Sequence, residues 1–365
     1  MITSDKRGTD GPEPRRRPPG SQVGIREVAR RLDISIGTVS RALNNRYGVN
    51  AATRSKILDC ARRMGYVPNS AARRLKDRPG LNVGLFFAPF LSSKKEINPV
   101  ALQLIDILRE SIAAEGMALR LIFFTTEAEL QAQAEANQVD VAFFYGEFPE
   151  TSFRTVHELG IPAVVLHHRT DFPDQVSVLV DTRQAGFRAV EYLAALGHER
   201  IGLVTGPEIE MHTVGMREGF VEALAEFGLA RRDDWIVELD PASTNKDGAA
   251  RAVSPILRRD DRPSAIVFAS DWMALGGVKA ARDLGMSLPA DLSLVGYDNL
   301  PAGAEIEPAL TTFDVDLSKL SALLTRLAAD LGARRWTPGG AGHRDILLMP
   351  DLIKRRSCAC LRARA

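Results

Sequence analysis

Apolar residues at helical spacing open the patterned part of the chain. Four of them, at positions i, i+3, i+4 and i+7, predict one face of a short helix: Ile25, Val28, Ala29 and Leu32. After a break at residues 33–34, Ser35 is a suitable N-cap for a second helix over residues 36–43. Val39 of this second helix is expected in the core, pointing back at Val28. Two short helices about a tight turn form a helix-turn-helix candidate.

A third helix is predicted directly after this pair. Asn50 can cap it, and we expect it to end at Gly65, with Pro68 just beyond. Residues 69–76 read NSAARRLK and are too few to be stable as an isolated helix. A short linker at residues 77–80 follows, after which the composition changes.

From residue 81 onward, apolar strand-like runs alternate with helical segments. The first strand runs lie at 81–88, 118–124, 139–145 and 161–166, separated by helices at about 99–115, 127–136 and 150–159. A second set of strand runs lies at 200–205, 235–239, 264–269 and 292–297, alternating with helices near 184–196, 212–228, 247–259 and 272–284. Such alternation predicts two Rossmann-like lobes, each with a parallel sheet and right-handed crossovers.

The formal net charge of +1 conceals an uneven distribution. Residues 1–80 hold 18 lysines and arginines against 7 acidic residues, whereas the remainder holds 29 against 39. A basic head on an acidic body favours an anionic polymer as the partner at one end. Residues 1–20 are rich in glycine, proline and charge without apolar periodicity, so we expect a disordered basic arm.

Several classes of protein do not fit the sequence. No apolar run reaches membrane-spanning length, and the N-terminus lacks the apolar region of a secretory signal. The three cysteines, Cys60, Cys358 and Cys360, then indicate reduced thiols in the cytoplasm. No dinucleotide, P-loop, nucleophile-elbow or zinc-protease motif is present, so we expect no enzyme activity, cofactor or metal.

An ordered series of motifs resembles the LacI/GalR family of bacterial transcription regulators. The head segment IREVARRLDISIGTVSRALNN (25–45) contains Thr38-Val39-Ser40-Arg41 and continues without gaps through GYVPNSAARRL (65–75). The later motifs are GHERIGLVTGP (197–207), REGF around Arg217, SDWMALG (270–276), VGYD (295–298), LTTF (310–313) and RRSC (355–358). The resemblance covers essentially the whole chain from about residue 23.

The resemblance implies a small all-α helix-turn-helix head and an α/β sensor domain of two Rossmann-like lobes, as in type I periplasmic-binding proteins. The expected division is a basic arm (1–20), the DNA-binding domain (21–68), a hinge helix and linker (69–80), the sensor domain (81–358) and a tail (359–365). Within the sensor domain, we expect the N-lobe at about 81–180 and 313–343, and the C-lobe at about 181–312 and 344–358.

A recognition helix in the major groove presents its first residues to base edges, and short polar side chains reach phosphates. Arg41 is the residue best suited to a bidentate contact with guanine. By family match, Leu75 would wedge into the minor groove as the hinge folds on DNA; alternatively, it packs under the linker. The full set of predicted DNA contacts is Ser35, Ile36, Gly37, Thr38, Ser40, Arg41, Asn44, Asn50, Thr53, Tyr66, Asn69, Ala72, Leu75 and Lys76.

Ligands of open α/β sheets bind beyond the carboxyl ends of the strands. By family match, Arg217 and Asp298 would hold ligand hydroxyl or carboxylate groups, which suits a sugar or polyol. The predicted effector-binding residues are His168, Arg217, Ser270, Asp271 and Asp298. Three have equally ordinary alternatives: an ion pair of Arg217 with Glu218 or Glu222, a helix cap at Asp271, and a satisfied strand-end histidine at His168.

Some positions depart from the family pattern. The family often has aspartate after the strand at IPAVVLHHR, where His168 stands, and asparagine is frequent in sugar sensors where Ser270 stands. No aromatic residue lies at 240–248, where some sugar sensors carry a stacking ring. These departures bear on the effector and leave the family resemblance intact.

The expected function is sequence-specific transcription regulation, as a repressor controlled by a small-molecule effector of sugar type. We expect a homodimer on a pseudo-palindromic double-stranded operator, without a C-terminal tetramerisation helix because no heptad leucines follow Cys358. The alternative is a solute-binding protein without a regulatory role, which predicts a signal peptide and no basic head. A sugar-modifying enzyme would need a base and a nucleophile that the sequence does not show.

Overall fold

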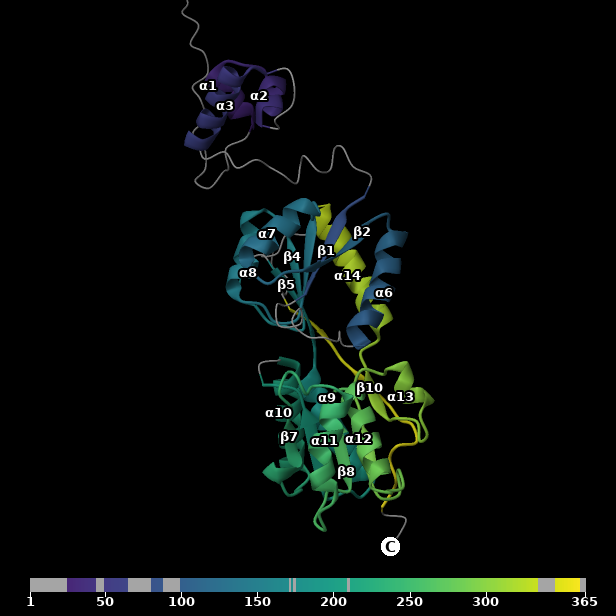
Figure 1. The fold of residues 1–365 in the computed structure, drawn as a ribbon. Coiled ribbons are helices and arrows are strands. Elements are labelled where there is room, and N and C mark those ends of the chain that lie inside the picture. The colour runs from purple at the N-terminus through teal and green to yellow at the C-terminus, as the bar shows by residue number, and fades with distance from the viewer. Residues whose placement is uncertain are drawn as a thin grey trace, which may run out of the picture. The chain divides into compact units, whose positions relative to one another are not determined.

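The computed structural model describes residues 25–43, 49–64, 80–87, 99–170, 172, 175–208, 211–333 and 345–361. Contacts between residues divide the chain into two compact units, Met1–Lys76 and Asp77–Ala365, which are described separately. Figure 1 labels most of the helices and several of the strands of the two units.

The described residues of the first unit contain three helices: α1 (Ile25–Leu32), α2 (Ile36–Leu43) and α3 (Ala51–Arg63). All three lie where the periodicity predicts them, and α3 stops at Arg63, two residues before the expected Gly65. Val28 and Val39 are both fully buried in the core that these helices share, as expected, together with Ile57 and Cys60. One small apolar cluster therefore joins the three described helices.

The N-lobe of the second unit is built on a six-stranded parallel sheet in the order β11-β5-β4-β3-β1-β2. Its strands are β1 (Asn82–Phe87), β2 (Ala118–Phe123), β3 (Val141–Tyr145), β4 (Ala163–Leu166), β5 (Gln175–Val180) and β11 (Asp345–Leu348). Its helices are α6 (Pro99–Ala114), α7 (Glu127–Ala136), α8 (Glu150–Glu158) and α14 (Leu317–Gly332). Figure 1 shows α6 and α14 on one face of the sheet and α7 and α8 on the other, over two separate apolar clusters.

The C-lobe contains a four-stranded parallel sheet in the order β7-β6-β8-β9. Its strands are β6 (Ile201–Thr205), β7 (Ile236–Glu238), β8 (Ala265–Phe268) and β9 (Ser293–Val295). Its helices are α9 (Thr182–Ala195), α10 (Met211–Glu226), the short 3-10 helix η1 (Asp233–Trp235), α11 (Lys246–Leu257), α12 (Asp271–Asp283) and α13 (Pro301–Glu305). Helix α9 packs closely on α10, where a Cβ on Gly219 would overlap the Arg183 carbonyl, so this contact requires glycine.

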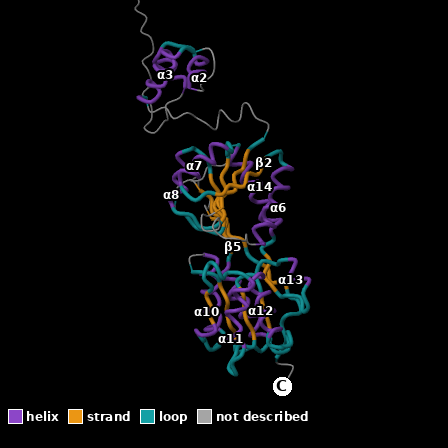
Figure 2. Tube along the Cα trace, in the orientation of Figure 1, coloured by secondary structure: helices purple, strands orange, loops and turns teal. Residues whose placement is uncertain are grey.

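The chain crosses between the two lobes three times: from β5 to α9, from β10 (Thr312–Asp314) to α14, and from β11 to β12 (Asp351–Ile353). Strands β10 and β12 pair antiparallel as a separate two-stranded sheet. In Figure 2 the strands of each lobe form a bundle flanked by helices, and the crossing segments run between the two bundles.

The predicted strand and helix runs match observed elements to within a few residues, but four strands and two helices were not predicted. These are β5, β10, β11, β12, α13 and α14. The expected return to the C-lobe at residue 344 is wrong, because β11 still pairs with β5 in the N-lobe sheet. The chain therefore returns to the C-lobe after β11 and not before it.

Candidate DNA-binding and effector sites

The N-terminus of α2 is an exposed, capped helix end. The Thr38 backbone N–H donates to Ser35 Oγ at 3.1 Å, and the two hydroxyls lie 2.9 Å apart. Ser35, Ile36 and Gly37 are all exposed, and the Ile36 side chain keeps 46% of its surface in solvent. Since α2 buries Val39 and Ala42 against the other helices, its opening residues are free to contact another molecule.

Helix α3 begins with a second side-chain cap. The Thr53 backbone N–H donates to Asn50 Oδ1 at 2.8 Å, and Asn50 is exposed. Ser40 and Arg41 lie on α2, but their side-chain environment is outside the described part of the structure. Six further predicted DNA contacts lie outside the described residues altogether: Asn44, Tyr66, Asn69, Ala72, Leu75 and Lys76.

In the second unit, polar residues gather at the carboxyl edge of the C-lobe sheet. Glu208 follows β6, Glu238 ends β7, Ser270 and Asp271 follow β8, and Asp298 follows β9. Since the four strands are parallel, all of these residues lie at one edge of the sheet, where ligands of α/β proteins bind.

Arg217 of α10 is drawn into this edge by two acidic residues. Its Nη1 forms an ion pair with Glu208, and Glu238 Oε2 lies 3.8 Å away. The predicted alternative partners were Glu218 and Glu222, whereas the observed partners come from the ends of β6 and β7. The Arg217 side chain remains 33% exposed, so it is accessible to a ligand but already carries compensating charge.

Asp298 has the one carboxylate oxygen in the described residues that is buried without a hydrogen-bond partner, namely Oδ2. Burial raises the pKa of Asp298 well above its ordinary value, and the neighbouring Asp271 raises it further. Its backbone adopts a φ of +106°, in a region that side chains rarely occupy, and its N–H donates to the Phe313 carbonyl at 2.9 Å. A strained residue with an unsatisfied buried oxygen is the kind of group that a ligand completes.

Ser270 and Asp271 use their side chains within the protein. Ser270 caps α12, because its Oγ accepts the Met273 backbone N–H at 3.2 Å. The alternative for Asp271, a helix cap, is wrong, since α12 begins one residue earlier than predicted. Asp271 is fully buried, and both of its oxygens accept hydrogen bonds.

His168 and His167 lie just beyond β4 but face different surroundings. The His168 ring stacks on Phe153 of α8, with ring centroids 6.1 Å apart. His167 has a φ of +61° and packs edge-on against Tyr145 at the end of β3, at 5.4 Å. Burial, with a smaller contribution from His212, lowers the pKa of His167 to about 4.

Residues missed from the sequence complete this picture. The His212 ring on α10 lies 5.0 Å from the ring of Tyr297, and its Nε2 lies 2.9 Å from the Ala269 carbonyl oxygen. Tyr297 is buried and directly precedes Asp298. The strand-end position of His167 and Tyr145 was a usable signal, whereas nothing local marks His212.

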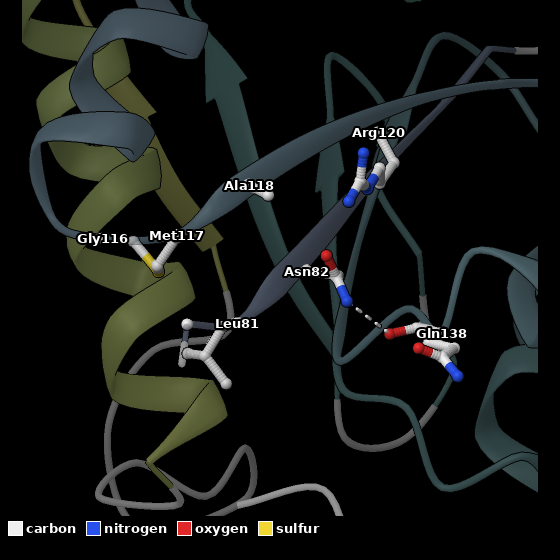
Figure 3. Close-up of a pocket in the computed structure, with 8 residues that line it drawn as sticks. Leu81, Asn82, Gly116, Met117, Ala118, Arg120 and Gln138 are labelled. Carbon is white, nitrogen blue, oxygen red and sulfur yellow. Dashed lines mark hydrogen bonds between the residues drawn. The ribbon is translucent and has the colours of Figure 1, made fainter. Parts of the chain in front are cut away.

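A pocket of about 360 Å³ lies at the amino edge of the N-lobe sheet, where β1 and β2 begin (Figure 3). It is lined by residues at the starts of β1 and β2, including Asn82, Met117 and Arg120, and by Gln138, whose carbonyl accepts from Asn82 Nδ2 at 3.3 Å. Because Gly80 also lines it, the pocket lies where the chain enters the second unit, away from the carboxyl edge.

The described residues contain neither a metal-binding cluster nor a membrane-spanning helix. Among the described residues, no group of three or more histidines, cysteines or acidic residues has the arrangement to hold a metal ion. None of the described helices combines the length and hydropathy needed to cross a bilayer.

Comparison with known proteins identifies two family matches. Residues 24–69 match the description "Bacterial regulatory proteins, lacI family", and residues 190–358 match "Periplasmic binding protein-like domain". The first match covers α1, α2 and α3. The second covers most of the C-lobe, the two later crossing segments, and α14 and β11 of the N-lobe.

Individual proteins are similar over most of the chain. Catabolite control protein A of Priestia megaterium is 32% identical over 316 residues, which cover 84% of this chain and 91% of that protein. The transcriptional repressor PurR of Edwardsiella ictaluri is 30% identical over 344 residues, covering 92% and 96% respectively.

Solved structures share the fold. A lac repressor dimer bound to operator and the anti-inducer ONPF is 22% identical with a TM-score of 0.65, covering 93% of this chain and all of that one. A complex of the transcriptional regulator CelR with cellobiose gives 23% identity and a TM-score of 0.65, covering 92% of this chain and all of that one. These similarities include the head as well as both lobes.

Proposed function

The chain belongs to the LacI family of bacterial regulatory proteins, and we propose that it is a repressor whose operator affinity is set by a small, hydrogen-bond-donating effector. Membership makes it a DNA-binding transcription regulator controlled by a small molecule. The observation that carries the finer proposal is the pairing, in one chain, of a helix with an exposed capped N-terminus and a sheet edge with an unsatisfied buried carboxylate. A stand-alone solute-binding protein receives no support from the comparisons.

We propose that α2 enters the major groove. Its exposed opening residues Ser35, Ile36 and Gly37 suit contact with base edges, and Thr38, Thr53 and Asn50 suit phosphates. Arg41 remains the predicted guanine reader, and Leu75 the predicted minor-groove wedge. Since DNA is the site of action, we propose that the protein works in the cytoplasm.

A second copy of the chain is the partner that fits one surface of the N-lobe. Leu102 on α6 and Leu121 and Phe123 on β2 are large apolar side chains that remain 44–47% exposed. Helix α6 and strand β2 pack together, and β2 is an edge strand of the sheet. An apolar edge of this kind is a candidate for burial between subunits. A two-fold dimer would place two heads on a pseudo-palindromic operator.

The effector is proposed to contact Arg217 and Asp298, with His167 added to the sequence-based set. Asp298 Oδ2 has no hydrogen-bond partner within the protein, and Arg217 is already balanced by Glu208 and Glu238. This charge distribution favours a ligand rich in hydroxyl or amino groups over an anionic one. A sugar or sugar derivative has that chemistry. His168 and Ser270 remain predicted contacts, although each side chain has a partner within the protein.

An electrophoretic mobility shift tests the DNA proposal. Wild type should retard DNA from upstream of its own gene more tightly than a random duplex of equal length at fixed salt. Arg41→Ala should reduce that discrimination by about 1–3 kcal/mol, since a bidentate base contact is lost. Arg326→Ala, an exposed arginine on α14, is the matched control and should leave discrimination unchanged. Equal affinity of wild type for both duplexes would contradict the proposal.

A thermal-shift screen of neutral sugars, amino sugars, sugar acids and sugar phosphates tests the effector class. A ligand at 100 times its dissociation constant should stabilise the protein by about 2.7 kcal/mol. For the ligand found, Asp298→Ala and Arg217→Ala should each weaken binding while effector-free DNA affinity stays constant. A response confined to anionic ligands would overturn the proposed class without touching the DNA proposal.

A further inference from the structure

We infer that Asp271 is a positioning residue that ties the loop bearing Asp298 and the crossing strand β10 to the start of α12. The link itself is a property of the fold. Its regulatory meaning rests on the proposed effector role of Asp298.

The first half of the link holds the loop after β9. Asp271 Oδ2 accepts the Leu300 backbone N–H at 2.7 Å, and the Asp271 N–H donates to the Tyr297 carbonyl at 2.6 Å. These two bonds clamp the loop on either side of Asp298 and Asn299. Both clamped residues have positive φ, +106° and +53°, so their backbone needs external contacts to hold it.

The second half of the link reaches the crossing strand. Asp271 Oδ1 accepts the Thr312 hydroxyl at 2.6 Å, and Thr312 is the first residue of β10. The Asp298 N–H donates to the Phe313 carbonyl of the same strand at 2.9 Å. The loop and β10 are therefore joined both directly and through Asp271, and β10 leads into α14 of the N-lobe.

Asp271 has no solvent-exposed surface and no unoccupied oxygen with which to contact a ligand. Asp271 is fully buried, and a Cβ on Gly296 would overlap its Oδ1. Arg355 closes the other side of the loop, with Nη2 donating to Asn299 Oδ1 at 2.5 Å and Nη1 to the Leu310 carbonyl at 2.8 Å. With both oxygens already accepting internal donors, Asp271 acts on a ligand through Asp298 rather than by contact.

This geometry gives a route from the effector edge to the crossing segments. A ligand that bonds to Asp298 Oδ2 pulls on a loop whose two ends are fixed to α12, and that loop shares hydrogen bonds with β10. Displacement of the loop must then be accompanied by β10 or break two buried bonds, and breaking them is the costlier course. Asp298 and β10 therefore move as one body.

Hydrogen exchange on the full-length, effector-free protein tests the link. Asp271→Ala removes both acceptors and should speed exchange at residues 297–300 and 311–314 by about tenfold or more, as expected for buried bonds lost. Asp271→Asn can accept from Leu300 with its oxygen and donate to the Thr312 hydroxyl with its amide, so it should restore near wild-type exchange. Asp283→Ala, at an exposed position of the same helix, is the matched control and should change neither segment.

A conservative variant keeps the test informative if Asp271→Ala does not fold. Thr312→Val preserves shape but removes the hydroxyl that donates to Asp271 and accepts the Asn299 N–H at 3.4 Å. It should therefore loosen residues 311–314 and Asn299, while the Asp271 bond still protects Leu300. Faster exchange spread evenly over the C-lobe, including β6, would show a general packing role and overturn the inference. Failure of Asp271→Asn to restore protection, or no effect of Thr312→Val at β10, would overturn it as well. None of these outcomes depends on which effector binds.

Discussion

At the level of single residues, the carboxyl edge of the C-lobe sheet contains two buried carboxyl groups, those of Asp271 and Asp298. Asp298 keeps an oxygen without a partner, whereas Asp271 has both oxygens occupied. From the sequence, both were predicted to contact the effector, Asp298 by family match and Asp271 by its place after a strand, with a helix cap as the alternative for Asp271. Their hydrogen bonds distinguish them: Asp298 has an oxygen left for the proposed ligand, whereas Asp271 uses both of its oxygens within the fold.

The pH dependence of the unfolding free energy should reflect the titration of Asp271. Burial raises its pKa from 3.8 to about 7 in the folded protein, against the opposing effects of Thr312, Leu300 and Arg355. The folded state therefore holds this proton more tightly than the unfolded state does. The resulting stabilisation is complete below about pH 4 and is lost as pH rises through about 7.

Asp271→Asn removes this titration while keeping the hydrogen bonds. Relative to wild type, its unfolding free energy should therefore rise by roughly 2–3 kcal/mol between pH 5 and pH 8. Urea unfolding at several pH values measures the difference, with Asp283→Asn as the exposed control on the same helix. A difference between Asp271→Asn and wild type that stays constant across this range would contradict the proposed titration.

Prediction from sequence was most successful for elements and least so for single side chains at the site. The helices of the head and most of the alternating elements at 81–297 have a clear periodicity of apolar residues, and this periodicity is enough to locate them. Strand β5 and helix α14 were missed although Val176 and Val178, and Leu320 and Leu324, carried the required spacing. The pairing of β11 with β5 joins residues far apart in sequence, and no local pattern encodes it.

The strand ends show which features of the candidate effector site the sequence does not indicate. His167 rather than His168 meets Tyr145, because the chain takes a positive φ directly after β4 and turns the next residue toward α8. A single backbone angle of this kind changes which side chain faces the sheet edge. Likewise, Glu208 and Glu238 reach Arg217 only through strand order.

Within the head, substitutions at Ser35, the cap of α2, can separate helix stability from the proposed DNA recognition. Ser35→Ala removes the acceptor for the Thr38 N–H and should cost about 1 kcal/mol of helix stability. Ser35→Asp keeps an acceptor there but adds a negative charge that faces DNA. It should therefore leave exchange of residues 36–43 near wild type while weakening operator binding severalfold. Equal operator affinity for Ser35→Asp and wild type would place this end of α2 away from the phosphates.

In the C-lobe, four side chains join the segment around η1 to the end of α11. Arg232 and Arg259 each pair with both Asp234 and Asp261, with N···O distances of 2.7–3.0 Å. Hydrogen bonds from Arg259 and then Arg232 lower the pKa of Asp261 to about 2. Stabilisation from this carboxylate is therefore present above its unfolded pKa and is lost as pH falls toward 2.

Salt should weaken this cluster because its members are partly exposed. Asp261→Asn should lower the melting temperature in dilute buffer, and the deficit should shrink in about 1 M salt, where the screening length is about 3 Å. The neighbouring exposed Asp260→Asn is the matched control and should change little in either condition. A deficit that is independent of salt would indicate lost packing instead of lost ion pairing.

At the scale of the whole molecule, the proposed dimer would place two heads on one operator. The apolar edge formed by Leu102, Leu121 and Phe123 is the proposed contact, because exposed leucine and phenylalanine on an edge strand and its adjoining helix favour burial. Phe123 also stacks on Phe87, with ring centroids 4.7 Å apart, so it supports the N-lobe core as well. Leu102 and Leu121 are thus the positions where charge can be introduced with least damage to folding.

Leu102→Glu combined with Leu121→Glu should therefore yield a folded monomer, because four buried charges across a two-fold interface would be unpaired. Analytical ultracentrifugation over a range of protein concentrations measures the change, and circular dichroism confirms folding. Operator affinity should fall toward that for a random duplex, since each head then binds alone and the gain from linked heads is lost. Leu347→Glu, on the opposite edge strand β11 and 53% exposed in wild type, is the control and should remain dimeric. A double variant that stays dimeric and retains operator affinity would move the interface away from α6 and β2.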